Sequence, residues 1–254
     1  MIHLRIFAAS KVAVLHLASS IAIAVLVAAI IFLLWYPYPF YGLTDGRDIF
    51  LIVLAVAVIF GPLLIIVIFN PVKSRIEILL DLALIVAIQL FILGYGLHIL
   101  SKVRPLFLVQ EIDRFKVVLA SDLASGSLTL LPSILKPSWY LGPITVAIRE
   151  PKNTQERQKV MFESVQGGRD YAERPEFYLP YEGKAALKSL QRAKPLAVFL
   201  QKQPSQEDAA RKLAAEKGAD MAQWLYLPIV ARQDWVAVLD HKGQIQGFLK
   251  GEGF

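Results

Sequence analysis

The first hundred residues contain three long apolar runs separated by short polar segments. Residues 12–34 and 49–69 carry no charged residue, and residues 78–100 carry one, Asp81. Each run matches the roughly 20 helical residues that are needed to cross the hydrocarbon core of a bilayer. The pattern predicts three transmembrane helices, within a membrane region that spans residues 1–104.

The first run is predicted to be a retained span and not a cleaved signal peptide. It exceeds the roughly 7–15 apolar residues of a signal-peptide core. It also ends in an aromatic and proline-rich segment, WYPYPFY at residues 35–41. Tryptophan and tyrosine favour the headgroup level of a bilayer, and proline stops a helix.

Beyond residue 104, short apolar runs alternate with polar turns and amphipathic stretches, which predicts an α+β extramembrane domain over residues 105–254. Strands are expected at residues 106–110, 115–120, 144–148, 196–200, 225–231, 236–240 and 244–249. The last three are separated by short polar turns and predict an antiparallel C-terminal meander. Helices are expected over residues 154–165, 184–193 and 205–217, with Thr154 and Ser205 as caps.

Both ends of the third apolar run carry helix-stopping residues. Asn70 and Pro71 end the preceding helix, and Arg104 and Pro105 follow the third one. Proline lacks a backbone N–H and cannot continue a helix. We therefore treat these four residues as candidate structural residues.

The basic residues that flank the spans predict the orientation of the chain. Those on the N-terminal side are Arg5, Lys11, Lys73 and Arg75, and those on the opposite side are Arg47, Lys102 and Arg104. Cytoplasmic loops carry an excess of Lys and Arg. The small bias favours a cytoplasmic N-terminus, with the C-terminal domain in the periplasm of a bacterial inner membrane.

Polar and small residues mark one face of the third predicted helix. Asp81, Gln89 and Gly96 fall within an arc of roughly 80° at about 100° per residue. Such a face favours close helix–helix contact, either among the three spans or with a helix of another protein. In the C-terminal domain, a core position is favoured for Trp235, which is also a candidate partner-facing residue.

Composition changes this picture little. Hydrophobic residues make up 56% of the chain, as expected for a membrane protein, and the net charge is +6. The basic residues are evenly spread, so nucleic acid is rejected as a principal partner. The chain has no cysteine, which excludes disulfides, thiolate metal sites and a cysteine nucleophile.

The motifs of common enzymes are absent from the sequence. There is no phosphate-binding loop, no dinucleotide fingerprint, no zinc-protease motif and no nucleophile elbow. The histidines have no metal-ligand spacing, so neither a cofactor nor a metal is expected. Glu111 and Asp113 could form a catalytic carboxylate pair, but a solvated turn with Arg114 is the favoured interpretation. The motifs therefore predict a protein that is not an enzyme.

Several short segments together resemble the type IV pilin accessory proteins of the TfpX/TfpZ group. They are GPL at residues 61–63, FNP at 69–71, KSR at 73–75, DL at 81–82, QL at 89–90, YGL at 95–97, RP at 104–105, DRF at 113–115 and VV at 117–118, with LPI at 227–229, Trp235 and LD at 239–240. The likeness is best over residues 42–120.

The resemblance implies a multi-pass inner-membrane protein with a C-terminal extramembrane domain, which acts as a chaperone or modulator in type IV pilus biogenesis. A type IV pilin, other pilus assembly proteins and membrane lipid are the partners it implies. Two alternatives remain open. One is a membrane enzyme that modifies pilin or envelope glycans through Asp81, Glu111 or Asp113. The other is a membrane-anchored ligand-binding sensor.

Overall fold

A computed structural model describes residues 2–254, and their side chains from Ile6 onward. The chain divides into two compact units, one formed by residues up to 33 with residues 46–103, the other by residues 34–45 with residues 104–254. Each unit is described by itself. Arg5, which entered the orientation prediction, lies outside the described side chains.

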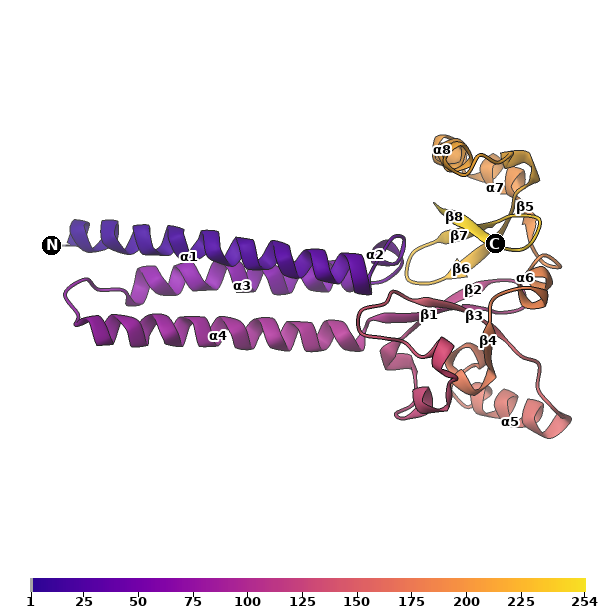
Figure 1. Ribbon diagram of the computed structural model, residues 1–254, viewed down its shortest axis with the longest axis horizontal. Coiled ribbons are helices and arrows are strands. Elements are labelled where there is room, and N and C mark those ends of the chain that lie inside the picture. Colours follow the sequence, from indigo (N-terminus) through magenta and orange to yellow (C-terminus); the bar gives the residue numbers. More distant parts are fainter. Residues whose placement is uncertain (1) are drawn as a thin grey trace. The chain divides into compact units, whose positions relative to one another are not determined.

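The first unit consists of three long helices, α1 (Ile2–Ile30), α3 (Gly46–Ile68) and α4 (Arg75–Lys102) (Figure 1). A short π-helix, η1 (Ile31–Trp35), continues α1. All three are long and apolar enough to cross a membrane, which confirms the predicted class of a multi-pass membrane protein. The helix α3 runs through Pro62 without a break.

The middle helix holds this unit together. Over the described residues, α3 packs against both α1 and α4, whereas α1 and α4 barely touch each other. Ala13, Ile65 and Ile85, one from each helix, form a small buried cluster. Most other apolar side chains of the three helices are exposed, as expected for surfaces that face lipid.

The turn between α3 and α4 is closed by local hydrogen bonds. Asn70 Oδ1 accepts from Val72 N at 3.2 Å, next to Pro71. Ser74 then caps α4: its hydroxyl accepts from Glu77 N, and the Glu77 carboxylate accepts from Ser74 N at 2.8 Å. This reciprocal capping box satisfies backbone donors that the helix cannot satisfy itself.

The second unit is built on an eight-stranded mixed sheet. Its strands are β1 (Pro105–Gln110), β2 (Phe115–Leu119), β3 (Ile144–Ile148), β4 (Tyr178–Pro180), β5 (Lys194–Pro195), β6 (Leu225–Val230), β7 (Trp235–Leu239) and β8 (Ile245–Lys250). The order is β4-β3-β1-β2-β6-β7-β8, and β5 pairs with β6. Because β6, β7 and β8 pair antiparallel, the C-terminal meander is confirmed.

Five α-helices accompany the sheet: α2 (Phe40–Leu43), α5 (Thr154–Val165), α6 (Lys184–Ser189), α7 (Leu196–Lys202) and α8 (Glu207–Lys217). The α+β class is therefore confirmed, with one element wrong. The strand predicted over residues 196–200 is the helix α7, because Leu196, Phe199 and Leu200 share one helical face and pack on the core.

Two predicted caps are also wrong. Asn153, one residue before Thr154, caps α5 by accepting from Glu156 N at 2.8 Å. The helix α8 begins at Glu207 and has no side-chain cap, because a 3-10 turn, η7 (Pro204–Gln206), takes up Ser205.

The core lies on both faces of the sheet, as β7 illustrates. Trp235, Ala237 and Leu239 point into one apolar cluster, and Val236 and Val238 point into another beneath α7 and α8. This alternation is the period of two of a β-strand. The first cluster also contains Phe40 and Leu43 of α2, so the segment 34–45 is part of the core of the sheet unit.

We predict that Gly243→Ala destabilises the sheet unit more than Gly126→Ala does. Both glycines have a positive φ, which costs a side-chain-bearing residue about 1–2 kcal/mol. A Cβ on Gly243 would in addition overlap the Ala186 carbonyl, whereas one on Gly126 meets nothing within 4 Å. Overpacking of this kind costs about 1–3 kcal/mol further. Urea unfolding of the full chain in detergent, followed by tryptophan fluorescence, measures the difference. Equal losses would contradict this explanation.

Candidate functional site

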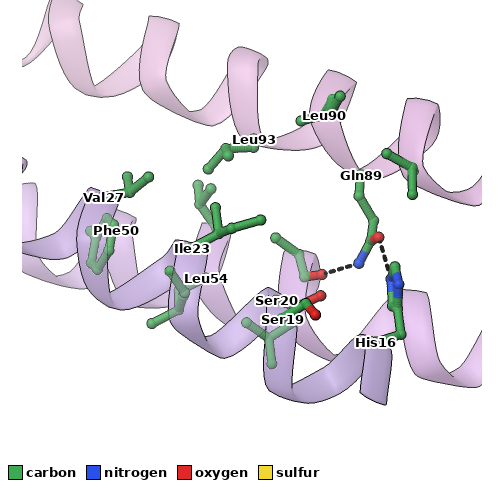
Figure 2. Close-up of a pocket in the computed structure, with 15 residues that line it drawn as sticks. His16, Ser19, Ser20, Ile23, Val27, Phe50, Leu54, Gln89, Leu90 and Leu93 are labelled. Atoms are coloured by element: carbon green, nitrogen blue, oxygen red, sulfur yellow. Dashed lines mark hydrogen bonds between the residues drawn. The ribbon is translucent and has the colours of Figure 1, made fainter. Parts of the chain in front are cut away.

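The three membrane helices meet at the side chain of Gln89, on α4. His16 Nε2, on α1, lies 2.6 Å from Gln89 Oε1, and Gln89 Nε2 donates to the Ala57 carbonyl of α3 at 2.8 Å (Figure 2). Because Oε1 can only accept, His16 donates through Nε2. One amide thus connects all three helices. We call the side chains of Gln89 and His16 the Gln89 cluster.

The position of this amide makes its hydrogen bonds important. Hydrocarbon offers no partner to a polar group, and hydrogen bonds between membrane helices contribute about 0.6–2 kcal/mol each. Gln89 was predicted to be a helix-contact residue, whereas His16 was not singled out. A histidine close to the start of an otherwise uncharged apolar run was the signal in the sequence.

Gly61 makes room for this cluster. A Cβ at Gly61 would overlap both the Gln89 amide and the imidazole of His16. A glycine on α3 therefore lets the two side chains reach the helix surface. In the sequence Gly61 stands out only as part of the GPL segment at residues 61–63, which does not indicate this role.

Gly96 gives α4 a second close approach to α3. It is buried, and a Cβ there would overlap the side chain of Val53. Gly94, two residues earlier, meets nothing within 4 Å. In this structure Gln89 and Gly96 therefore each contact another helix of the same unit.

Asp81 has a different setting. Its carboxylate forms an ion pair with Lys73, with Nζ 2.6 Å from Oδ2, and both side chains are partly exposed. Asn70 and Pro71 lie in the same turn region and shape the entry to α4. These residues form a polar contact near the turn, separate from the Gln89 cluster.

A cavity of about 190 Å³ lies beside the Gln89 cluster, lined by α1, α3 and α4. Because α1 and α4 make few contacts with each other, the cavity is a groove between these two helices, and residues of α3 form its third side (Figure 2). We call it the α1–α4 groove. Its lining residues are His16, Ser19, Ser20, Ile23, Ala24 and Val27 of α1, Phe50, Val53, Leu54, Ala57 and Val58 of α3, and Val86, Gln89, Leu90 and Leu93 of α4.

The chemistry of the groove suits an apolar ligand. Most of the lining is aliphatic, and the polar groups are hydroxyls, one imidazole and one amide. Among the described residues, no group of three or more His, Asp or Glu could hold a metal ion. The groove can therefore accept hydrocarbon or an apolar helix, with a few hydrogen-bonding groups at one end.

Arg104 follows α4 and anchors a loop of the sheet unit. Its guanidinium donates to the carbonyls of Ser138 (2.8 Å), Trp139 (3.2 Å) and Leu141, and it lies over the Trp35 ring at 5.4 Å. Burial lowers the pKa of Arg104, which still stays protonated. The next residue, Pro105, begins β1.

Trp235 is a core residue. It is only 9% exposed, and its ring packs against the Tyr38 ring in a T-shaped arrangement with 6.0 Å between centroids. Gly42 packs against the same indole. In this structure the side chain therefore offers no surface to a partner, in contrast to the partner-facing position considered for it.

The two carboxylates of the β1–β2 turn differ in environment. Asp113 pairs with Arg114 at 2.7 Å, and this hydrogen bond lowers the pKa of its carboxyl group. Burial raises the pKa of Glu111. The carboxylate of Asp113 is thus engaged by the adjacent guanidinium, as expected for an ion-paired turn.

Three long apolar helices with an α+β unit define a multi-pass membrane protein with an extramembrane domain. Comparison with known proteins then gives the family. Residues 4–44 match the family model described as fimbrial assembly protein FimB. No solved structure matches the chain.

Two relatives from Dichelobacter nodosus extend this match. The fimbrial assembly protein of serogroup I is 29% identical over 253 residues, 98% of each chain. That of serogroups C1 and C2 is 32% identical over 119 residues, 47% of this chain and 91% of the relative. The chain therefore belongs to the FimB family of fimbrial assembly proteins, and the predicted membership of a type IV pilus accessory family is confirmed.

We predict that Gly96→Ala destabilises the helical unit and that Gly94→Ala does not. The new methyl group at residue 96 would overlap Val53, whose branched side chain has little freedom to move, and overpacking costs about 1–3 kcal/mol. At residue 94 the methyl group enters open space. Thermal unfolding of the two variants in the same detergent tests this. Equal melting temperatures would show that α4 does not depend on this approach to α3.

Proposed function

We infer that the chain is a non-enzymatic accessory factor of fimbrial biogenesis that binds a pilin before its assembly at the inner membrane. Its relatives are named fimbrial assembly proteins. A pilin in the membrane has one apolar helix and a head outside the bilayer. A protein with both spans and an extramembrane unit can contact each part.

The α1–α4 groove is the observation on which the proposal depends. In a three-helix unit the sparse contact between α1 and α4, which includes the His16–Gln89 hydrogen bond, leaves one seam that another helix can enter. Small residues on α1, namely Ser19, Ser20 and Ala24, line the groove and permit a close approach. We propose that the apolar helix of the pilin occupies this seam while the pilin awaits assembly.

Binding, and not catalysis, is the proposed mode of action. Asp81 is paired with Lys73 and Asp113 with Arg114, so two of the three carboxylates considered for an enzyme already have partners. A holding function needs only differential affinity for the free pilin. The chain would then stabilise the pilin and release it to the assembly machinery.

We predict that filling the groove abolishes the function while leaving the protein folded. Ala24→Phe places a ring in the groove, whereas Ala22→Phe lies about 200° away around α1, on an exposed position. In a strain that lacks the gene, Ala22→Phe should restore surface pili and Ala24→Phe should not, at equal levels of protein.

A photo-crosslinking residue gives a direct measurement of the same contact. At Leu90, which lines the groove, it should form an adduct with the pilin; at Ile88, on another face of α4, it should not. Equal adducts at both positions would contradict the groove as the binding site. If deletion of the gene left both the surface pili and the pilin level unchanged, the proposed function itself would be contradicted.

We predict an orientation with the turn between α3 and α4 in the cytoplasm and the sheet unit in the periplasm. Because the chain has no cysteine, a single introduced cysteine is the only thiol that a maleimide can label, so its labelling shows on which side of the membrane it lies. Val72, in the α3–α4 turn, and Ile112, in the β1–β2 turn, are both highly exposed. In intact spheroplasts a membrane-impermeant maleimide should label Ile112→Cys, and should label Val72→Cys only after lysis. The reverse pattern would invert the topology.

A further inference from the structure

One loop of the sheet unit exposes large apolar side chains. Trp139, Tyr140 and Leu141 are 69%, 53% and 46% exposed. They lie in the segment 136–143, between the 3-10 turn η4 (Ser133–Leu135) and β3. Contiguous aromatic and aliphatic exposure of this kind marks a contact surface.

The backbone of this loop is held firmly even though its side chains are free. Arg104 donates to the carbonyls of Ser138, Trp139 and Leu141, and Trp35 Nε1 donates to the same Trp139 carbonyl at 2.7 Å. With the carbonyls turned toward these donors, the side chains of residues 139–141 remain outside the core.

Arg104 has an unusual environment for an arginine. Arg104 is 6% exposed, and no carboxylate of the described residues forms an ion pair with it. Its charge is met by loop carbonyls and by the Trp35 ring. The guanidinium fork suits this task, because it presents five donors in a fixed plane.

Trp35 and Arg104 both lie at the ends of membrane-spanning segments. Trp35 is the last residue of η1, which continues α1, and Arg104 is the second residue after α4. At 3.8 Å between successive Cα atoms, Arg104 lies within about 8 Å of the last residue of α4. A loop bonded directly to these two residues therefore lies where the chain leaves the bilayer.

We propose that residues 138–141 form a membrane-interface anchor, with the rings of Trp139 and Tyr140 inserted among the lipid headgroups. Tryptophan and tyrosine favour this level of a bilayer, because an apolar ring and a polar edge are both satisfied there. The neighbouring Lys136 is exposed and can meet lipid phosphates. The occupant is the lipid surface, and Arg104 and Trp35 act as positioning residues.

This anchor is independent of any pilin. It requires only that α1 and α4 span the bilayer, and it attaches the sheet unit to the membrane in addition to the chain connections. A protein partner on the same rings is the competing explanation, and the experiment below distinguishes the two because it contains no other protein.

The cysteine-free chain allows a direct test in lipid. Trp139→Cys carries an environment-sensitive fluorophore in liposomes that contain lipids with a nitroxide on the headgroup or high on the acyl chain. Ile112→Cys is the control: it is exposed in the turn at the far end of β1, roughly 20 Å of strand from Arg104.

We expect the nitroxide lipids to quench the label at residue 139 about twofold or more and to leave the label at residue 112 unchanged. Equal quenching at both positions, or none at 139, would overturn the proposal. Should Trp139→Cys fail to fold, brominated lipids provide a second measurement. They should quench the wild-type tryptophan emission more than that of Trp139→Phe, and no difference between the two would likewise overturn the anchor.

Discussion

A side-chain amide among apolar helices must find its hydrogen-bond partners on those helices, because hydrocarbon supplies none. In this protein Gln89 finds one partner on α1 and another on α3. Apolar contact alone gives membrane helices little preference for each other over lipid. The Gln89 hydrogen bonds and the close approaches at Gly61 and Gly96 therefore determine how the three helices pack.

This way of joining three helices has a structural consequence. Since both close approaches involve α3, the outer helices pack mainly against it and touch each other at few points, among them the His16–Gln89 hydrogen bond. The seam between α1 and α4 stays open, and the polar cluster lies at one end of it. The residues that stabilise the unit thus also shape the groove to which we assign pilin binding.

The sequence predicted those features that depend on local pattern. Apolar run length identified the three spans, alternation identified the C-terminal meander, and a mid-span amide pointed to Gln89. It could not supply the partners of that amide, because His16 and Gly61 are brought to it only by helix packing. The orientation and the domain boundary remain predictions.

Two features of the sheet unit could not be decided from local pattern. The run 196–200 is apolar enough for a strand or a helix, and the core beneath α7 decides between them. For Trp235 both a core and a partner-facing position stayed open, because its neighbours Tyr38 and Gly42 are nearly two hundred positions away in the sequence. Burial created by such distant segments leaves no local pattern to detect.

The placement of residues 34–45 in the sheet core bears on how the protein is made. Asp45 and Arg232 form an ion pair across 187 positions of the chain. At about 5–20 residues per second of synthesis, the first loop waits roughly 10–40 s for the strands that cover it. During that interval Phe40 and Leu43 have no core to join. The newly made chain therefore passes through a stage in which its membrane helices are complete and its outer unit is not yet able to close.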